Sequence, residues 1–218
     1  MKKILFLHRS VGENLIKDGK MYELIATHGD DELSDFNQNT SVLRDADGSR
    51  KTDMVMPGGN TTPRDFAALF RDDYHSPLKD LTMEFDAIVI KSCYPNSNIK
   101  SSAELHEVQN YYRSIAQYLT QHADKKLIIL TSPPLIPLLT NRANATRARE
   151  LAYWLAHTEF GENVSIFNLF DELANNSGTQ ANMLRREYRR ILPFDAHPNK
   201  LASQTIAPKL IQFIVETL

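Results

Sequence analysis

The chain has 218 residues, a length that fits one domain of ordinary size. Hydrophobic residues make up 42% and charged residues 24%, as in globular proteins, which excludes collagen, coiled coils and membrane-spanning bundles. The 25 Lys and Arg against 27 Asp and Glu give a net charge of −2, so no basic excess points to nucleic acid as a partner. The single cysteine, Cys93, excludes an intrachain disulfide framework and a cysteine-based zinc site.

The N-terminus has the charge of a signal peptide but not its apolar core. Lys2 and Lys3 precede an apolar run of four residues, Ile4–Leu7, whereas a secretory core needs about 7–15. No other stretch approaches the ~20 apolar residues of a spanning helix. We therefore expect a cytoplasmic protein without a membrane span.

Short apolar runs punctuate the chain, each nearly continuous in apolar character, as strands buried on both faces are. These predicted strands are residues 4–7, 85–90, 127–130 and 164–169, with a weaker one between Leu33 and Val55. The polar stretch 30–52 is long for a connection and is typical of a binding loop or a mobile segment.

Amphipathic stretches between these runs predict helices. Thr62 and Pro63 form a helix start with proline at the first position, and Ser101 with Glu104 forms a capping box. The predicted helices are residues 14–27, 64–71, 101–122, 142–160, 181–190 and 200–217. The alternation predicts an α/β fold, with a parallel sheet of about five strands and helices on both faces, in one domain over residues 1–218.

In open α/β sheets, ligands bind beyond the carboxyl ends of the strands, so the residues after each run are candidates for a site. Ser10 follows the first run, where its hydroxyl would lie at the positive end of a helix. Gly58 and Gly59 precede the helix at 64–71 and allow close backbone approach to a ligand. Ser10 could equally cap its helix, and the glycines could form a turn with no other role.

Two further segments complete the set of polar residues. Asn96 and Asn98 follow the run at 85–90, and Asp195 and His197 lie directly before the last helix. Each segment alone has a local structural explanation. Together they supply a nucleophile, a base, an orienting carboxylate and oxyanion donors, which is the equipment of acyl transfer.

The order and content of these segments resemble the SGNH (GDSL-like) hydrolases, a family of flavodoxin-like three-layer α/β/α esterases, along the whole chain. In that family a Gly-Asp-Ser block ends the first strand, and residues 8–10 occupy this place. The resemblance implies that Ser10 is the nucleophile. The second block is similar to residues 58–62, which implies Gly58 or Gly59, with Gly59 favoured, as a backbone oxyanion donor.

The later blocks extend the resemblance. The third falls on residues 93–96, which implies Asn96 as an oxyanion donor, with Asn98 as the second candidate. The fifth block, Asp-x-x-His-Pro, is similar to residues 195–198 and implies Asp195 and His197 as the triad partners of Ser10. The implied activity is hydrolysis of a short acyl ester, such as an O-acetyl group on a carbohydrate, by an SGNH-type carboxylic ester hydrolase. Neither a cofactor nor a metal is implied, and the partner is a small-molecule ester.

The chain departs from the family pattern at three places. His8 and Arg9 replace glycine and aspartate of the first block, the third block lacks its glycine, and the Asp–His spacing is one residue shorter. The shorter spacing favours an alternative, a catalytically inactive domain on the same fold that binds a carbohydrate or another ligand. A nucleotide- or flavin-binding protein is a further alternative, but the chain has no Gly-x-Gly-x-x-Gly or Gly-x-x-x-x-Gly-Lys-Ser/Thr motif.

Overall fold

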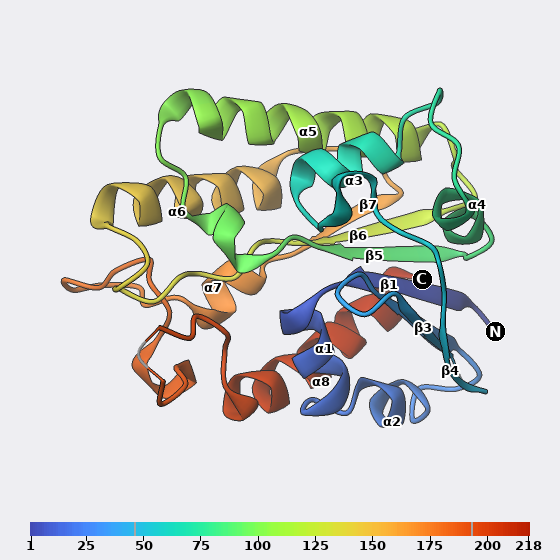
Figure 1. The fold of residues 1–218 in the computed structure, drawn as a ribbon, viewed down its shortest axis with the longest axis horizontal. Helices are drawn as coiled ribbons and strands as arrows, with labels where there is room; N and C mark the ends of the chain where they lie inside the picture. The colour runs from blue at the N-terminus through green and yellow to red at the C-terminus, as the bar shows by residue number, and fades with distance from the viewer. Residues whose placement is uncertain (46, 193) are drawn as a thin grey trace.

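Five adjacent parallel strands make up most of the sheet in this computed structural model, which describes residues 1–45, 47–192 and 194–218 (Figure 1). In sheet order they are β2 (Glu32–Asn37), β1 (Lys3–His8), β5 (Ala87–Lys91), β6 (Lys126–Leu130) and β7 (Val164–Phe167). The predicted α/β fold with a parallel sheet of about five strands is therefore confirmed. Because these five strands are parallel, their carboxyl ends lie at the same edge of the sheet. Segments that are far apart in the sequence therefore meet at this edge.

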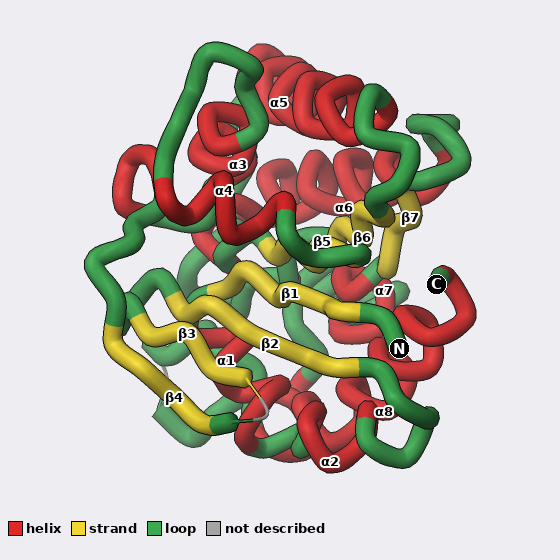
Figure 2. Tube along the Cα trace, turned by 90° about the vertical axis from the view of Figure 1, so that its right-hand side faces the viewer, coloured by secondary structure: helices red, strands yellow, loops and turns green. Residues whose placement is uncertain are grey.

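Two antiparallel strands extend the sheet beyond β2. They are β3 (Val42–Asp45) and β4 (Gly48–Lys51), and they bring the sheet to seven strands (Figure 2). The stretch 30–52 thus contains a weak strand, as predicted, and a hairpin in place of most of the expected long connection. β2 is difficult to recognise as a buried strand from the sequence, because the polar residues Asp35 and Asn37 are buried along with Leu33 and Phe36.

Helices cover both faces of the sheet, as Figures 1 and 2 show. One face carries α3 (Pro63–Leu69), α4 (Pro77–Met83), α5 (Ser102–Thr120) and α6 (Arg142–His157). The other carries α1 (Ser10–Lys17), α2 (Met21–Ile25) and α8 (Lys200–Thr217). The short helix α7 (Leu169–Leu173) follows β7 and contacts both α6 and α8.

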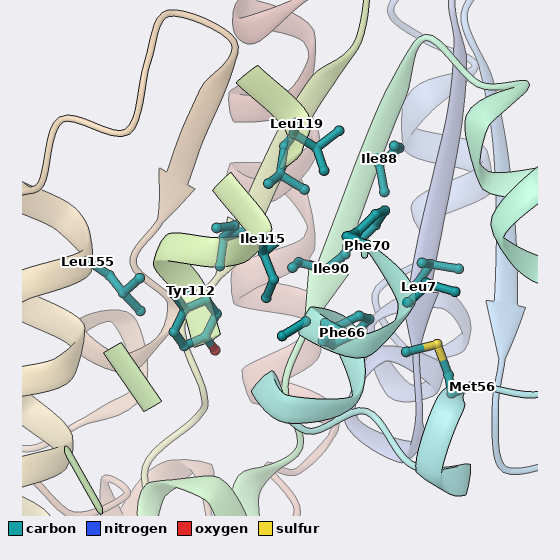
Figure 3. Packing of buried hydrophobic residues seen from close by; sticks show 14 of the residues in the cluster. Leu7, Met56, Phe66, Phe70, Ile88, Ile90, Tyr112, Ile115, Leu119 and Leu155 are labelled. Atoms are coloured by element: carbon teal, nitrogen blue, oxygen red, sulfur yellow. The ribbon is translucent and has the colours of Figure 1, made fainter. Parts of the chain in front are cut away.

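The strands divide their apolar side chains between two cores because successive side chains point to opposite faces. Leu7, Ile88 and Ile90 pack against α3 and α5 in the cluster of Figure 3, where Phe66, Tyr112 and Ile115 are labelled. Ile4, Phe6 and Val89 face α1 and α8 in the second cluster. The two clusters fill the space between the sheet and the helices on its two faces.

Two helix predictions are corrected. The stretch 14–27 is broken, since α1 ends at Lys17 and Lys20 adopts a left-handed conformation with φ 58° before α2 begins. The helix predicted at 181–190 is wrong, and only a 3₁₀ turn at Arg186–Tyr188 is present. There Arg185 donates to the carbonyl of Ala174 and Arg189 to that of Leu184, so guanidinium groups hold an irregular chain in place of helical hydrogen bonds.

The segment at the end of α1 packs closely against α8 on one face of the sheet. A Cβ placed on Gly19, just after α1, would lie 2.5 Å from Cβ of Ala207 and 2.9 Å from the carbonyl oxygen of Ser203, both on α8. Only glycine allows the two segments to approach this closely. Among the described residues, no helix is both long and apolar enough to cross a membrane.

Candidate active site

Ser10 is the first residue of α1 and follows β1 with one residue between them. Arg9 occupies the N-cap position in an extended conformation and makes no side-chain cap. The N–H of Ser10 therefore belongs to the first turn of the helix, where backbone N–H groups lack an intrahelical partner. The partial positive charge of the helix start favours negative charge near this serine.

The structure brings Ser10, His197 and Asp195 into one hydrogen-bonded chain. Ser10 Oγ lies 2.8 Å from Nε2 of His197, across 187 positions of sequence, and Nδ1 of the same ring lies 2.6 Å from Oδ1 of Asp195. The short Asp–His spacing is accommodated because Oδ1 of Asp195 also accepts the backbone N–H of His197 at 2.9 Å. This is the connectivity of a nucleophile, a base and an orienting carboxylate.

The carboxylate of Asp195 is kept ionised by its neighbours. Burial opposes ionisation, but the hydrogen bonds from the backbone N–H and ring of His197 outweigh it and hold the pKa of Asp195 below its ordinary value. Arg190 adds a positive charge, with Nη1 3.3 Å from Oδ2. Ionised Asp195 fixes which ring nitrogen of His197 carries the proton.

Two neighbours hold the histidine in place. The ring of Tyr94 meets the ring of His197 edge to face, with centroids 4.9 Å apart. Asn199, two residues further on, caps α8 and donates its side-chain amide to the carbonyls of Glu187 and Arg189. Tyr94 was not among the predicted site residues, and no sequence pattern distinguishes it from a core tyrosine.

The two glycines form a turn that is linked to the residue before Ser10. Gly58 and Gly59 have φ of 73° and 71°, and the N–H of Gly59 donates to the carbonyl of Met56 at 2.9 Å. The following residue, Asn60, accepts a hydrogen bond from the guanidinium of Arg9. The turn is thereby tied to the residue before Ser10, and the amide of Gly59 is already engaged within it.

The two asparagines after β5 have different surroundings. The side-chain amide of Asn96 donates to the carbonyl of Cys93 at 2.9 Å and leaves its second N–H for another partner. Asn98 lies near the start of α6, where its Oδ1 accepts from Thr140, just before the helix, at 3.1 Å and from Asn144 at 2.9 Å. Asn98 therefore joins the end of η2 (Tyr94–Ser97) to the start of α6 through its oxygen, and both asparagines keep amide hydrogens without a described partner.

Comparison with solved structures gives the fold a name. The lipase/acylhydrolase from Enterococcus faecalis is 15% identical with a TM-score of 0.57 over 99% of this chain and 96% of that one. A GDSL-like lipase from Bacteroides thetaiotaomicron is 13% identical with a TM-score of 0.57 over 99% and 88%. The inhibitor-bound aryl esterase from M. smegmatis is 13% identical with a TM-score of 0.53 over the full length of both chains. The chain has the fold of the GDSL lipase–acylhydrolases. No family model and no curated protein sequence matches it.

Within this GDSL-type fold, His8 at the end of β1 forms a second His–Asp pair with Asp35 of β2. Nε2 of His8 lies 2.8 Å from Oδ2 of Asp35, and Nδ1 lies 2.8 Å from the carbonyl oxygen of Arg9. Both side chains are fully buried. A Cβ on Gly12 would lie 2.3 Å from Cβ of His8, so the imidazole occupies the space under the first turn of α1. The sequence analysis missed this pair, because Asp35 lies in a polar stretch that does not look buried.

Arg44, Glu13 and Tyr22 surround the buried pair. Arg44 donates from Nε to Asp35 at 2.9 Å and from Nη1 to Glu13 at 2.8 Å, and Tyr22 donates to Asp35 at 2.6 Å. Burial works against ionisation, yet hydrogen bonds from Arg44, Lys17 and Asn37 lower the pKa of Glu13 to about 2. Burial likewise raises the pKa of Asp35, but bonds from His8 and Arg44 more than offset it and lower that pKa overall.

These groups include three that could in principle hold a metal ion. Ligand atoms of His8, Glu13 and Asp35 lie within 4.8 Å of one another. The guanidinium of Arg44 lies among them and donates to both carboxylates, so a cation would have to displace an arginine. The donor set therefore fits an ion-pair network better than a metal.

Lys91 ends β5 inside the protein. It is fully buried, its Nζ donates to the carbonyl of Ser92 at 2.9 Å, and burial lowers its pKa to about 8. Near neutral pH this places a positive charge within the sheet edge that carries the candidate site.

Proposed function

We propose that this chain is a serine esterase that hydrolyses short acyl esters through a Ser-His-Asp triad. The hydrogen-bonded chain from Ser10 Oγ through His197 to Asp195 carries the proposal. The GDSL-type fold supports it, because proteins with this fold include a lipase/acylhydrolase and an aryl esterase. A short acyl group on a carbohydrate is the substrate class that the resemblance implies.

The first half of the reaction would form an acyl-enzyme. Nε2 of His197 takes the proton of Ser10 as Oγ bonds to the ester carbonyl carbon, and the carbonyl oxygen becomes an oxyanion. When the C–O bond to the alcohol breaks, His197 gives its proton to the departing oxygen. Asp195 keeps the imidazole in the required tautomer and stabilises its cation.

The oxyanion would be held by three N–H donors. The N–H of Ser10 lies in the unsatisfied first turn of α1, and Asn96 has one amide hydrogen without a described partner. Since the N–H of Gly59 is engaged with Met56, we assign the third donor to Gly58. Each such donor typically contributes about 10²–10³ in kcat.

The second half would release the acid. Water, deprotonated by His197, attacks the acyl carbon, and the bond to Ser10 Oγ breaks as the serine regains its proton. The reaction needs no redox step and no group from outside the chain and its two substrates.

A serine-directed fluorophosphonate tests the nucleophile. We expect the wild-type chain to hydrolyse 4-nitrophenyl acetate and to be labelled on Ser10, whereas Ser10→Ala loses both while its circular dichroism is unchanged. Ser49→Ala, at an exposed position of β4, is the matched control and should keep both activities. A label on another residue would overturn the assignment, and a folded wild-type chain that neither reacts nor hydrolyses would favour the inactive ligand-binding alternative.

A further inference from the structure

Large apolar side chains project into solvent next to the triad. The side chains of Ile191, Leu192 and Phe194 are 102%, 68% and 77% exposed, and Leu138 on a neighbouring loop is 64% exposed. Three such side chains within four positions form an apolar patch of a kind that marks an interaction surface. Of these residues, Leu138 and Leu192 line a cavity, described below.

The segment directly before Ile191 is strongly basic, although the chain as a whole is slightly acidic. Residues 185–190 hold four arginines and one glutamate, a formal charge of +3, against −2 for the whole chain. Arg186 is exposed and makes no described side-chain hydrogen bond. Arg189 donates to neutral oxygens of Leu184 and Gln180, so its charge is not balanced by those partners. Only Arg190 is paired with an acid among these arginines and their described partners, namely Asp195.

A cavity beside this surface reaches Asp195 of the candidate site. It has a volume of about 320 Å³ and lies between the apolar patch and the triad's carboxylate. Its walls combine the apolar Ile136, Leu138 and Leu192 with Arg189, Arg190 and Asp195. An aliphatic chain with an anionic group at its polar end matches this lining.

We propose that the surface formed by Leu138, Arg186, Arg189, Ile191, Leu192 and Phe194, here called the arginine–apolar surface, docks on an anionic phospholipid membrane. Exposed aliphatic and aromatic side chains insert into the headgroup and acyl boundary, and neighbouring arginines are attracted to anionic lipids. A second copy of the chain is a poorer occupant, because a two-fold contact would place two basic segments against each other. Docking here would bring the cavity beside Asp195 next to the membrane, and the docking itself does not depend on the proposed function.

Sedimentation of the full chain with vesicles tests the docking. We expect binding to vesicles of phosphatidylglycerol and phosphatidylcholine, and much weaker binding to phosphatidylcholine alone. Ile191→Ser with Leu192→Ser should weaken binding at least tenfold, and Arg186→Gln about fivefold on the anionic vesicles. Tyr153→Ser on α6 and Arg50→Gln on β4, both exposed, are matched controls that should bind as the wild type does. Ser10→Ala should also bind normally, which separates docking from catalysis.

Fluorescence gives an independent readout of insertion. The chain has a single tryptophan, Trp154, so Phe194→Trp in a Trp154→Phe background places the only indole on the surface. We expect its emission to shift to shorter wavelength when anionic vesicles are added. The proposal is overturned if the shift is absent, if the Ile191 and Leu192 variant binds vesicles as tightly as the controls, or if the surface substitutions instead convert a wild-type dimer into a monomer.

Discussion

His197 with Asp195 and His8 with Asp35 are both hydrogen-bonded imidazole–carboxylate pairs, yet they differ in what their free atoms face. The first pair is partly exposed, at 24% and 20% of the side-chain surface, and its remaining ring nitrogen faces Ser10 Oγ. The second pair is fully buried, and its remaining ring nitrogen faces a backbone carbonyl oxygen. A histidine can relay a proton only when one ring nitrogen faces an exchangeable group, so residue type alone does not distinguish the two.

The carboxylates of the two pairs, Asp195 and Asp35, also differ in the partners from which they accept hydrogen bonds. Asp195 accepts two bonds from one residue and orients it. Asp35 accepts from His8, Tyr22 and Arg44, which lie on three different elements, and so joins β1, α2 and β3. We therefore expect the first pair to affect rate and the second to affect stability.

The largest expected effect is on rate at the exposed pair. Asp195→Asn should lower kcat for 4-nitrophenyl acetate by about 10³–10⁴, because the amide can no longer hold His197 in the tautomer that accepts the serine proton. Asp35→Asn, measured as the folded protein, should change kcat by less than about tenfold. Equal losses of kcat in the two variants would contradict the division between the pairs.

The next effect is on stability at the buried pair. Asp35→Asn should lower the free energy of unfolding by about 3–5 kcal/mol, since it leaves Arg44 and His8 facing a neutral amide in the interior. Asp195→Asn should lower it by less than about 1 kcal/mol, as expected for a pair near the surface. Urea denaturation of both variants measures the difference, and a smaller loss for Asp35→Asn than for Asp195→Asn would reverse our assignment.

The smallest effect is an acid sensitivity of the buried network. The pKa of Glu13 is lowered to about 2 in the folded chain, so its stabilisation is complete above its ordinary pKa of about 4.5 and is lost as pH falls between these values. After allowance for screening at a partly exposed group, we expect about 1–2 kcal/mol. Glu13→Gln should flatten the fall in stability between pH 5 and pH 2.5, whereas Glu23→Gln, at an exposed position, should leave it unchanged. An identical slope in both variants would exclude Glu13 as its source.

The parallel core of the sheet could be predicted from the sequence, and the residues around it only in part. Short continuous apolar runs such as Leu127–Leu130 favour strands buried on both faces, because they are too short for a helix. β2 was harder, since its buried Asp35 is satisfied by side chains from other elements. The helix α4 was missed although Ser76 and Pro77 give the same start signal as Thr62 and Pro63.

At the candidate site, the sequence predicted the residue types and the structure adds their surroundings. Ser10 could be named because it follows a strand end, and Asp195 and His197 because they lie directly before the last helix in an order that resembles a known family. The engagement of Gly59 with Met56 and of Asn98 with α6 depends on loop geometry that no residue pattern encodes. The irregular path of residues 181–190 was missed for a similar reason, because arginine-to-carbonyl bonds replaced helical ones.

The close approach of α1 and α8 at Gly19 has a consequence for how the triad keeps its spacing. Ser10 is the first residue of α1, and His197 lies three residues before α8. The contact between the two helices therefore helps to set the distance between the Ser10 hydroxyl and the His197 imidazole. Warming that loosens this contact would separate the two groups while both cores remain intact. Activity would then be lost at a lower temperature than the one at which the whole chain unfolds. The difference between these two temperatures would measure the strength of the contact between α1 and α8.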